Sequence, residues 1–234
     1  MKPKCIVPLS GGLDSTVIYH AAISQGLDVH AVGYDYGQKH ASKELSCARE
    51  LVRKTTGDEL KVIELSFFKD IVTTSALTNN SIAVAKARDV VGDPQTVNYV
   101  PNRNMMMLSI CTAYAESIEA TKVFHGAALV DSQAGFWDGS KEFLSAINAV
   151  NQLNRRTRIE IIAPLILKSK ADIISMGVNL QVDFSKTWTC YEGAELACGE
   201  CTACSSRIKG FVDAGQADPI AYNIDIPWEK LITV

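Results

Sequence analysis

The sequence lacks the features that mark membrane and secreted proteins. No apolar run approaches the roughly 20 residues that a membrane-spanning helix needs, and the first apolar stretch ends early, at Ser10-Gly11-Gly12, unlike a secretory signal. Internal repeats and low-complexity segments are also missing. We therefore expect a cytoplasmic protein with no membrane partner.

An excess of basic charge is absent as well. The 23 Lys and Arg residues against 26 Asp and Glu residues give a net charge of -3. Proteins that coat nucleic acid through counterion release need a basic face, so we expect no direct nucleic-acid partner. With 234 residues, of which 47% are hydrophobic, the chain suits one domain over residues 1–234 with a sizeable core.

Two familiar phosphate-binding motifs are missing: no Gly-Lys-Ser/Thr of a Walker A loop and no G-x-G-x-x-G occur near the start. The chain instead has the string Ser10-Gly11-Gly12-Leu13-Asp14-Ser15-Thr16. It lies between a predicted strand over 5–9 and a predicted helix over 13–24. Two glycines allow a tight turn, and amides at the helix start favour an anion. An ordinary capped turn is the alternative, but the whole string directly after a first strand favours a nucleotide.

Strands and helices alternate along the chain. Strands are predicted over 5–9, 29–34, 60–65, 122–126 and 159–163, with helices over 13–24, 42–56, 102–118, 141–154, 171–176 and 204–214. This order indicates a parallel sheet flanked by helices, an α/β fold. Residues 70–100 are irregular, which is typical of a functional loop or lid. Asn102 is expected to cap the helix that follows it.

Four of the seven cysteines crowd together near the C-terminal end. Cys190, Cys198, Cys201 and Cys204 have the spacing C-x7-C-x2-C-x2-C. Four thiolates predict a structural zinc site in a segment of about 187–212, and an iron–sulfur cluster is the rival. A closed site of this kind leaves no position for substrate. The remaining thiols, Cys5, Cys47 and Cys111, carry no such pattern and are predicted to be inert.

Four segments carry a resemblance to a known family. They are Leu9 to Thr16, Tyr34 to His40, Tyr99 to Asn104, and Thr187 to Tyr191 with the run Cys198-Gly199-Glu200-Cys201-Thr202-Ala203-Cys204. In order and spacing they resemble the 7-cyano-7-deazaguanine (preQ0) synthases, which belong to the N-type ATP pyrophosphatases. The resemblance extends from about residue 5 to residue 212. It implies the adenine nucleotide alpha hydrolase-like, or PP-loop, fold with a C-terminal zinc-binding segment.

The resemblance also implies a reaction. ATP adenylates 7-carboxy-7-deazaguanine, ammonia displaces AMP to give an amide, and a second activation dehydrates the amide to the nitrile preQ0. ATP, Mg2+ and Zn2+ would be the cofactors, and the family suggests a homodimer. A related enzyme acting on another deazapurine, on tRNA or on a protein, and a nucleotide sensor without catalysis, are the alternatives.

Site residues follow from the motifs and the resemblance. Asp14, Ser15 and Arg103 are the expected catalytic residues, and Asp14 holds Mg2+ or caps its helix. The predicted ATP contacts are Leu9, Ser10, Gly11, Gly12, Leu13, Asp14, Ser15, Thr16, Val17, Ile18 and Tyr19. The predicted substrate contacts are Tyr36, Gln38, His40, Asp131, Trp137 and Asp138.

Each of these residues also has a plain structural interpretation, such as a capping histidine, a solvated arginine or a packed tryptophan. Two departures from the family pattern stand out. The stretch Gly135-Phe136-Trp137-Asp138-Gly139-Ser140 replaces the usual Gly-Tyr-Pro-Asp-Cys-Arg, and Asn102 replaces a frequent glycine. The first departure leaves the identity of the substrate open.

Overall fold

The computed structural model describes residues 2–90 and 96–232. Its centre is a five-stranded sheet with the order β3-β2-β1-β4-β5, in which every neighbouring pair is parallel. The strands are β1 (Lys4–Pro8), β2 (Asp28–Asp35), β3 (Lys61–Glu64), β4 (Lys122–Phe124) and β5 (Glu160–Ile162). The predicted parallel α/β fold is therefore confirmed.

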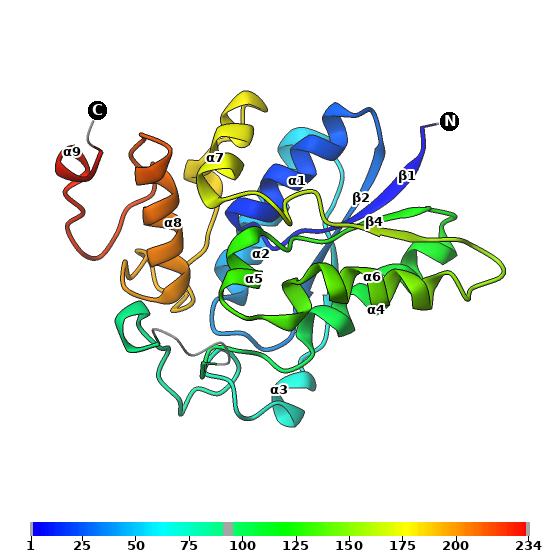
Figure 1. Ribbon diagram of the computed structural model, residues 1–234, viewed down its shortest axis with the longest axis horizontal. Helices are drawn as coiled ribbons and strands as arrows, with labels where there is room; N and C mark the ends of the chain where they lie inside the picture. The colour runs from blue at the N-terminus through cyan, green and yellow to red at the C-terminus, as the bar shows by residue number, and fades with distance from the viewer. Residues whose placement is uncertain (1, 91–95, 233–234) are drawn as a thin grey trace.

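Helices cover both faces of this sheet (Figure 1). They are α1 (Leu13–Ser24), α2 (Ala41–Thr55), α3 (Phe68–Ile71), α4 (Arg103–Ser117), α5 (Leu129–Gln133), α6 (Lys141–Asn151), α7 (Lys170–Asn179), α8 (Thr202–Asp213) and α9 (Trp228–Leu231). Short 3-10 turns occur at Ala87–Asp89, Trp137–Gly139 and Phe184–Lys186. The sequence predicted the long helices and missed α3, α5 and α9, which are too short to show a helical period.

The sheet separates two apolar cores. Side chains alternate along β1, so Ile6 packs with Leu108 of α4 on one face, and Val7 packs with Val17 of α1 on the other. Helices α4 and α6 cover the first face, and α1, α2 and α7 cover the second. Each of these side chains is almost completely buried. At about 25 cal/mol per Å2 of buried apolar surface, the two cores supply most of the stabilisation of the fold.

The carboxyl ends of β1, β2 and β4 meet at one edge of the sheet. Register places Pro8 beside Val32, and Phe124 beside Ile162. The loops that follow these strands therefore lie next to one another. Ligands in open parallel sheets bind beyond this edge, and the site described below is built here.

Residues 72–90 and 96–102 are mostly irregular, as predicted for this segment, and residues 91–95 within it lie outside the described part of the chain. Backbone contacts join this segment to the cysteine-rich segment. Lys86 forms a β-bridge with Cys201, and the Ala87 N–H donates to the Glu200 carbonyl over 2.9 Å. In Figure 1 it passes below α8, at the cysteine-rich segment. The loop before α4 and the cysteine segment are therefore neighbours in space.

Asn102 shows why one sequence expectation was wrong. It occupies the N-cap position of α4, but its side chain makes no capping hydrogen bond. Its φ of 55° lies in the left-handed region, where glycine is favoured and asparagine is tolerated better than most other residues. This backbone requirement explains a glycine as the usual residue here. The described residues contain no helix long and apolar enough to cross a membrane.

Candidate active site

The turn after β1 is built on two glycines. Gly11 has φ 79°, and a Cβ atom there would lie 2.4 Å from the Glu44 carbonyl oxygen and 2.8 Å from the Ala48 amide nitrogen of α2. No other residue fits without moving the helix. Gly12 is the N-cap of α1 and adopts an extended conformation. The loop is thereby held closely against α2.

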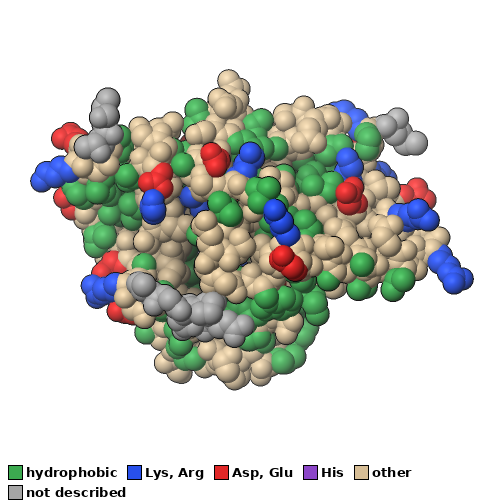
Figure 2. Space-filling model, in the orientation of Figure 1, with side chains coloured by type: hydrophobic (Ala, Val, Ile, Leu, Met, Phe, Trp, Pro, Cys, Tyr) green, Lys and Arg blue, Asp and Glu red, His purple; other side chains and the backbone are tan. Residues whose placement is uncertain are grey.

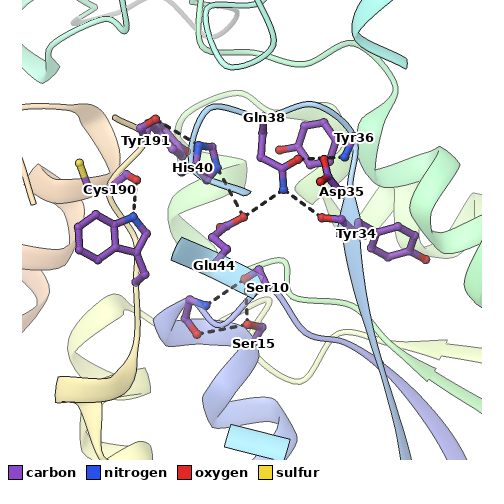
Figure 3. Close-up of polar contacts among 12 residues, drawn as sticks. Ser10, Ser15, Tyr34, Asp35, Tyr36, Gln38, His40, Glu44, Cys190 and Tyr191 are labelled. Atoms are coloured by element: carbon purple, nitrogen blue, oxygen red, sulfur yellow. Dashed lines mark hydrogen bonds and ion pairs between the residues drawn. The ribbon is translucent and has the colours of Figure 1, made fainter. Parts of the chain in front are cut away.

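Hydrogen bonds within the loop hold its hydroxyl groups in place (Figure 3). The Ser10 and Ser15 oxygens lie 3.0 Å apart, the Gly12 N–H donates to Ser10 Oγ over 3.1 Å, and Ser15 also contacts the Gly12 carbonyl at 3.2 Å. The first-turn N–H groups of Leu13, Asp14 and Ser15 donate to no acceptor within residues 2–90 and 96–232. Open donors at a helix start favour an anion.

Thr16 adds one more open group to the loop. Its side chain is 2% exposed, and its Oγ1 has no hydrogen-bond partner among the described residues. A buried hydroxyl without a partner costs free energy. A ligand group or a water molecule at this position would relieve that cost.

Asp14 does not cap its helix. Both of its carboxylate oxygens accept hydrogen bonds from Lys170 Nζ, at 2.8 and 2.7 Å. Lys170 begins α7, far along the sequence, and nothing in the residue pattern singled it out. The ion pair lies at the open end of the loop, since Asp14 belongs to the first turn of α1.

The segment after β2 supplies a polar wall (Figure 3). Both ends of the Gln38 side-chain amide are bonded to the backbone of this segment. Its Oε1 accepts from the Tyr36 N–H at 2.9 Å, and its Nε2 donates to the Tyr34 carbonyl at 3.0 Å. His40 Nδ1 lies 3.2 Å from the Tyr191 carbonyl, and its Nε2 lies 3.6 Å from Glu44. His40 is buried, so it holds segments together as well as facing the site.

Arg103 lies at the start of α4, where a helix dipole disfavours a cation. Its Nη1 donates to the Tyr36 hydroxyl over 3.3 Å, and its Nε contacts Asn104 Oδ1 at 3.4 Å. Burial opposes its charge, but Tyr36, Tyr191 and Asp138 nearby raise the pKa of Arg103 above its usual value. Among the described residues no carboxylate forms an ion pair with it. The guanidinium is thus a cation with capacity for an anionic ligand.

Two cavities meet at this arginine. One, of about 290 Å3, extends from the phosphate loop to Tyr34, Met107 and Leu108. The other, of about 480 Å3, extends between the 96–100 segment and the 133–139 segment. Residues that line both are Arg103, Asn104, Asp131 and Tyr191. Together they offer room for two molecules whose ends would meet at Arg103.

Asp131 and His125 belong to the segment that follows β4. Asp131 Oδ2 accepts the Ala128 N–H over 2.8 Å at the start of α5. Burial raises the pKa of Asp131, and the neighbouring Asp14 adds to the rise. Burial also lowers the pKa of His125, whose Nε2 lies 3.0 Å from the Asp138 carbonyl. That acceptor calls for a proton on Nε2, which leaves Nδ1 with the lone pair.

The stretch that departs from the family pattern forms part of the larger cavity. Asp138 is 4% exposed, and Phe136 stacks on Tyr99 with ring centroids 6.0 Å apart. Trp137 turns outward: it packs edge-on against Phe143 and donates from Nε1 to the Tyr99 hydroxyl over 2.8 Å. The aromatic faces at this cavity therefore belong to Phe136 and Tyr99, whereas the sequence pointed to Trp137.

The four clustered cysteines come together as predicted. The Sγ atoms of Cys190, Cys198, Cys201 and Cys204 all lie within 4.8 Å of one another. The Cys198 and Cys204 sulfurs are 3.9 Å apart, and a tetrahedral zinc with bonds of about 2.3 Å separates its sulfurs by about 3.8 Å. The donor set and its spacing fit a metal. The other three thiols are scattered through the fold, with Cys5 and Cys111 fully buried.

Sequence reasoning brought together most of the site but missed four of its residues. These are Glu44, His125, Lys170 and Tyr191, all of which line the smaller cavity or contact its loop. His125 had a signal, because it directly follows β4 and precedes Gly126, at the end of the sheet where ligands bind. Lys170 had none, since its partner lies 156 positions away.

The chain matches known proteins over nearly its whole length. A family model described as "Queuosine biosynthesis protein QueC" matches residues 4–215. The chain is 39% identical over 223 residues to a 7-cyano-7-deazaguanine synthase from Marinomonas sp. (strain MWYL1), covering 95% of this chain and 99% of that one. It is 40% identical over 225 residues to the one from Thermoplasma acidophilum, with coverages of 94% and 92%.

Solved structures show the same fold at low sequence identity. The U34-tRNA thiolase NcsA from Methanococcus maripaludis, with its [4Fe-4S] cluster, superposes with a TM-score of 0.50 at 16% identity, over 89% of this chain and 63% of that one. The NMN synthetase from Francisella tularensis gives 0.50 at 15%, over 99% and 82%. The predicted PP-loop type of fold is confirmed.

Proposed function

Since the chain belongs to the 7-cyano-7-deazaguanine synthase (QueC) family, we propose that it makes the nitrile by an ATP-dependent ligase mechanism. ATP adenylates the carboxylate of 7-carboxy-7-deazaguanine with release of pyrophosphate. Ammonia then displaces AMP to give the amide, and a second adenylation removes the amide oxygen as part of AMP. A carboxylate oxygen is a poor leaving group and AMP is a good one. Adenylation by ATP makes that oxygen part of AMP, so that it can be displaced.

ATP would occupy the smaller cavity. The open amides of Leu13, Asp14 and Ser15 suit the phosphates. At the other end, Tyr34 and Leu108 offer apolar surface to the adenine ring. Ser10, Gly11, Gly12, Thr16 and their neighbours through Tyr19 complete the predicted contacts, although Val17 and Tyr19 are fully buried and would act through packing. Asp14 would hold Mg2+, which supplies positive charge to the phosphates.

The deazapurine would occupy the larger cavity. Phe136 and Tyr99 present aromatic faces to a flat ring. Asp131 and Asp138 are acceptors for the N–H groups of a guanine-like edge, and such donors would offset the burial that raises the pKa of Asp131. Tyr36 and His40 line the smaller cavity, and Tyr36 contacts Arg103 at the junction. Gln38 would act indirectly, because both ends of its amide are already bonded.

The observation that carries this proposal is the position of Arg103. It lines both cavities and pairs with no carboxylate among the described residues. A substrate carboxylate and the α-phosphate of ATP could both reach it there. Arg103 would neutralise the two anions while they react, and it would stabilise charge that develops at the α-phosphorus.

The chain also offers a group for proton transfer. Ammonia attacks the adenylate as NH3, and the nitrogen that it adds must lose a proton as AMP leaves. His125 stays neutral because burial lowers its pKa, and its Nδ1 carries the free lone pair. We assign it as the acceptor of that proton. It lines the smaller cavity, as does Asp131, which also lines the larger one.

The cysteine site would hold zinc in a structural role, through Cys190, Cys198, Cys201 and Cys204. Zinc supplies cross-linking of the loop when bound, with no position left for substrate. We further propose a single domain over residues 1–234, a homodimer, ammonia as the nitrogen source, and a cytoplasmic location, where ATP is available. On the face in Figure 2, acidic and basic side chains are interspersed, so this face offers no extended basic surface to tRNA.

Mass spectrometry tests the function directly. The protein is incubated with ATP, Mg2+, ammonium and 7-carboxy-7-deazaguanine, and products are compared with those from reactions lacking one component. We expect the nitrile, an amide intermediate, and two pyrophosphates for each nitrile. ATP binding without any turnover would support a sensor instead. Turnover only with a different deazapurine would mean that the altered 135–140 stretch has changed the substrate.

A further inference from the structure

Lys170 and Asp14 form an ion pair at the mouth of the phosphate loop. The lysine Nζ contacts both carboxylate oxygens, at 2.8 and 2.7 Å, and its side chain is 15% exposed. Asp14 is also the carboxylate proposed to hold Mg2+. A metal ion and an ammonium group carry the same sign of charge and compete for these two oxygens. Metal binding at Asp14 would therefore weaken its contact with the lysine.

The neighbouring helix α8 leaves space for the Lys170 side chain at one residue, Gly210. Gly210 lies inside α8, where a glycine costs about 1 kcal/mol relative to alanine. A Cβ atom at this position would lie 2.2 Å from Lys170 Cγ and 2.8 Å from its Cβ. A helix-interior glycine therefore leaves the space through which the lysine stem reaches the loop. An ordinary surface lysine needs no such space.

The N-termini of helices α1 and α7 add positive potential at this ion pair. Asp14 belongs to the first turn of α1, and Lys170 is the first residue of α7, so their pairing brings two helix N-termini together. Figure 1 shows α1 and α7 side by side. Aligned peptide dipoles place partial positive charge at each of these ends. A lysine set between two such ends is poised for an anion that carries more charge than Asp14.

We propose that Lys170 is a catalytic residue that changes partner, from Asp14 in the nucleotide-free enzyme to the β- and γ-phosphates of ATP once Mg2+ occupies Asp14. In the adenylation step the bond from the α-phosphorus to the bridging oxygen breaks, and a carboxylate oxygen bonds to that phosphorus. The electron pair leaves with pyrophosphate. Lys170 keeps its proton and neutralises the departing charge. This role rests on the proposed ATP-dependent function.

Binding of three ligands to the whole protein separates this role from a structural one. AMP has no β- or γ-phosphate, so Lys170→Ala should leave AMP affinity within about twofold of wild type. Losing a charge-assisted hydrogen bond should weaken Mg-pyrophosphate and Mg-ATP by about 10- to 100-fold. Calorimetric titration measures all three. Lys170→Arg should recover part of the pyrophosphate affinity, because it restores the charge.

Lys209 provides a matched control on α8. It forms an exposed ion pair with Asp213, four residues away, and its side chain is 74% exposed. Lys209→Ala removes the same charge from the chain without touching the loop. Its affinities for AMP, pyrophosphate and Mg-ATP should equal those of wild type. A loss of pyrophosphate affinity in this variant would show that total charge, and not Lys170, is responsible.

Gly210→Ala tests the path of the lysine. The added methyl group would displace the Lys170 stem, so pyrophosphate affinity should fall while AMP affinity holds. In Lys170→Ala the Cγ atom is gone, so the methyl group of Gly210→Ala no longer collides with it. Adding Gly210→Ala to Lys170→Ala should therefore lower the melting temperature less than adding Gly210→Ala to the wild-type protein. If Gly210→Ala does not fold, the Lys170→Ala titrations still decide the matter.

The outcomes distinguish the two levels of the proposal. Unchanged pyrophosphate affinity in Lys170→Ala, or an equal loss of AMP affinity, would overturn the role of Lys170 alone, provided that wild type still releases pyrophosphate. A wild-type protein that binds neither AMP nor pyrophosphate would overturn the ATP-dependent function, and the role of Lys170 with it.

Discussion

The Trp188 amide donates to the Gly11 carbonyl over 2.9 Å. Trp188 lies two residues before the first cysteine of the metal site, and Gly11 is the left-handed residue of the phosphate loop. The indole N–H of Trp188 donates a hydrogen bond to the Cys190 carbonyl over 2.8 Å. A direct chain of hydrogen bonds therefore runs from the metal site to the loop.

Loss of the metal should accordingly disturb ATP binding as well as stability. Cys201→Ser should reduce bound metal, measured by elemental analysis, to a small fraction of the wild-type content. Structural zinc contributes folding free energy outright, so the melting temperature should also fall. The KM for ATP should rise, because the segment that carries Trp188 loosens. A Cys5→Ser variant should keep its metal.

Full metal content in Cys201→Ser would contradict the ligand assignment. Elemental analysis of wild type also decides between zinc and iron, the two candidates for a site of four thiolates. Zinc alone, with no visible absorption, is the expected result.

A second connection to this segment is an ion pair in the interior. Arg207 and Asp218 have side chains 1% and 0% exposed, and the same guanidinium donates to Thr187 and to the Phe184 carbonyl at 2.8 and 3.1 Å. Arg207→Met should lower the free energy of unfolding by about 3–5 kcal/mol, because Asp218 is left as a buried unpaired charge. Urea denaturation measures the loss.

The double variant Arg207→Met with Asp218→Leu is the matching control. It removes both charges and should be more stable than Arg207→Met alone. Equal instability of the single and double variants would mean that packing of the long side chain, and not the unpaired charge, dominates.

How much of this site the sequence predicts depends on the range of each interaction. The loop from Ser10 to Thr16 and the four cysteines are local patterns, in which spacing along the chain nearly determines spacing in space. Strand alternation likewise gives the sheet and the edge at which ligands bind. The substrate wall is different: Trp137 is aromatic and lies in the right segment, yet its direction is decided by Tyr99 and Phe143, which only the fold brings near.

Asp131 gives a prediction about pH. Its folded-state pKa is raised, mainly by burial, so the folded protein holds this proton more tightly than the unfolded chain. That contribution to stability is complete below the unfolded value of 3.8 and is lost as pH rises through the folded pKa. Relative to Asp131→Asn, wild type should therefore lose free energy of unfolding from about pH 4 upward, over the interval between the unfolded and the raised folded pKa of Asp131.

Urea denaturation of both proteins across this range provides the check. Asparagine keeps an oxygen for the Ala128 N–H but cannot ionise, so its curve should lack the decline. The variant should at the same time lose turnover, since it no longer offers a carboxylate to the base. If the free energies of unfolding of the two proteins change in parallel with pH, the pKa of Asp131 is the same in the folded and the unfolded protein, and the prediction is wrong.

Arg103 provides the sharpest test of how the two cavities work together. Arg103→Lys keeps a cation but loses the planar fork that can contact a carboxylate and a phosphate at once. We expect kcat/KM to fall by about 100- to 1000-fold, as for removal of a preorganised transition-state donor, with AMP affinity within about threefold of wild type. Lys141→Ala, an exposed residue at the start of α6, is the control and should match wild type. Wild-type kcat/KM in Arg103→Lys would mean that charge alone suffices at the junction, and the simultaneous contact with both reactants would have to be abandoned.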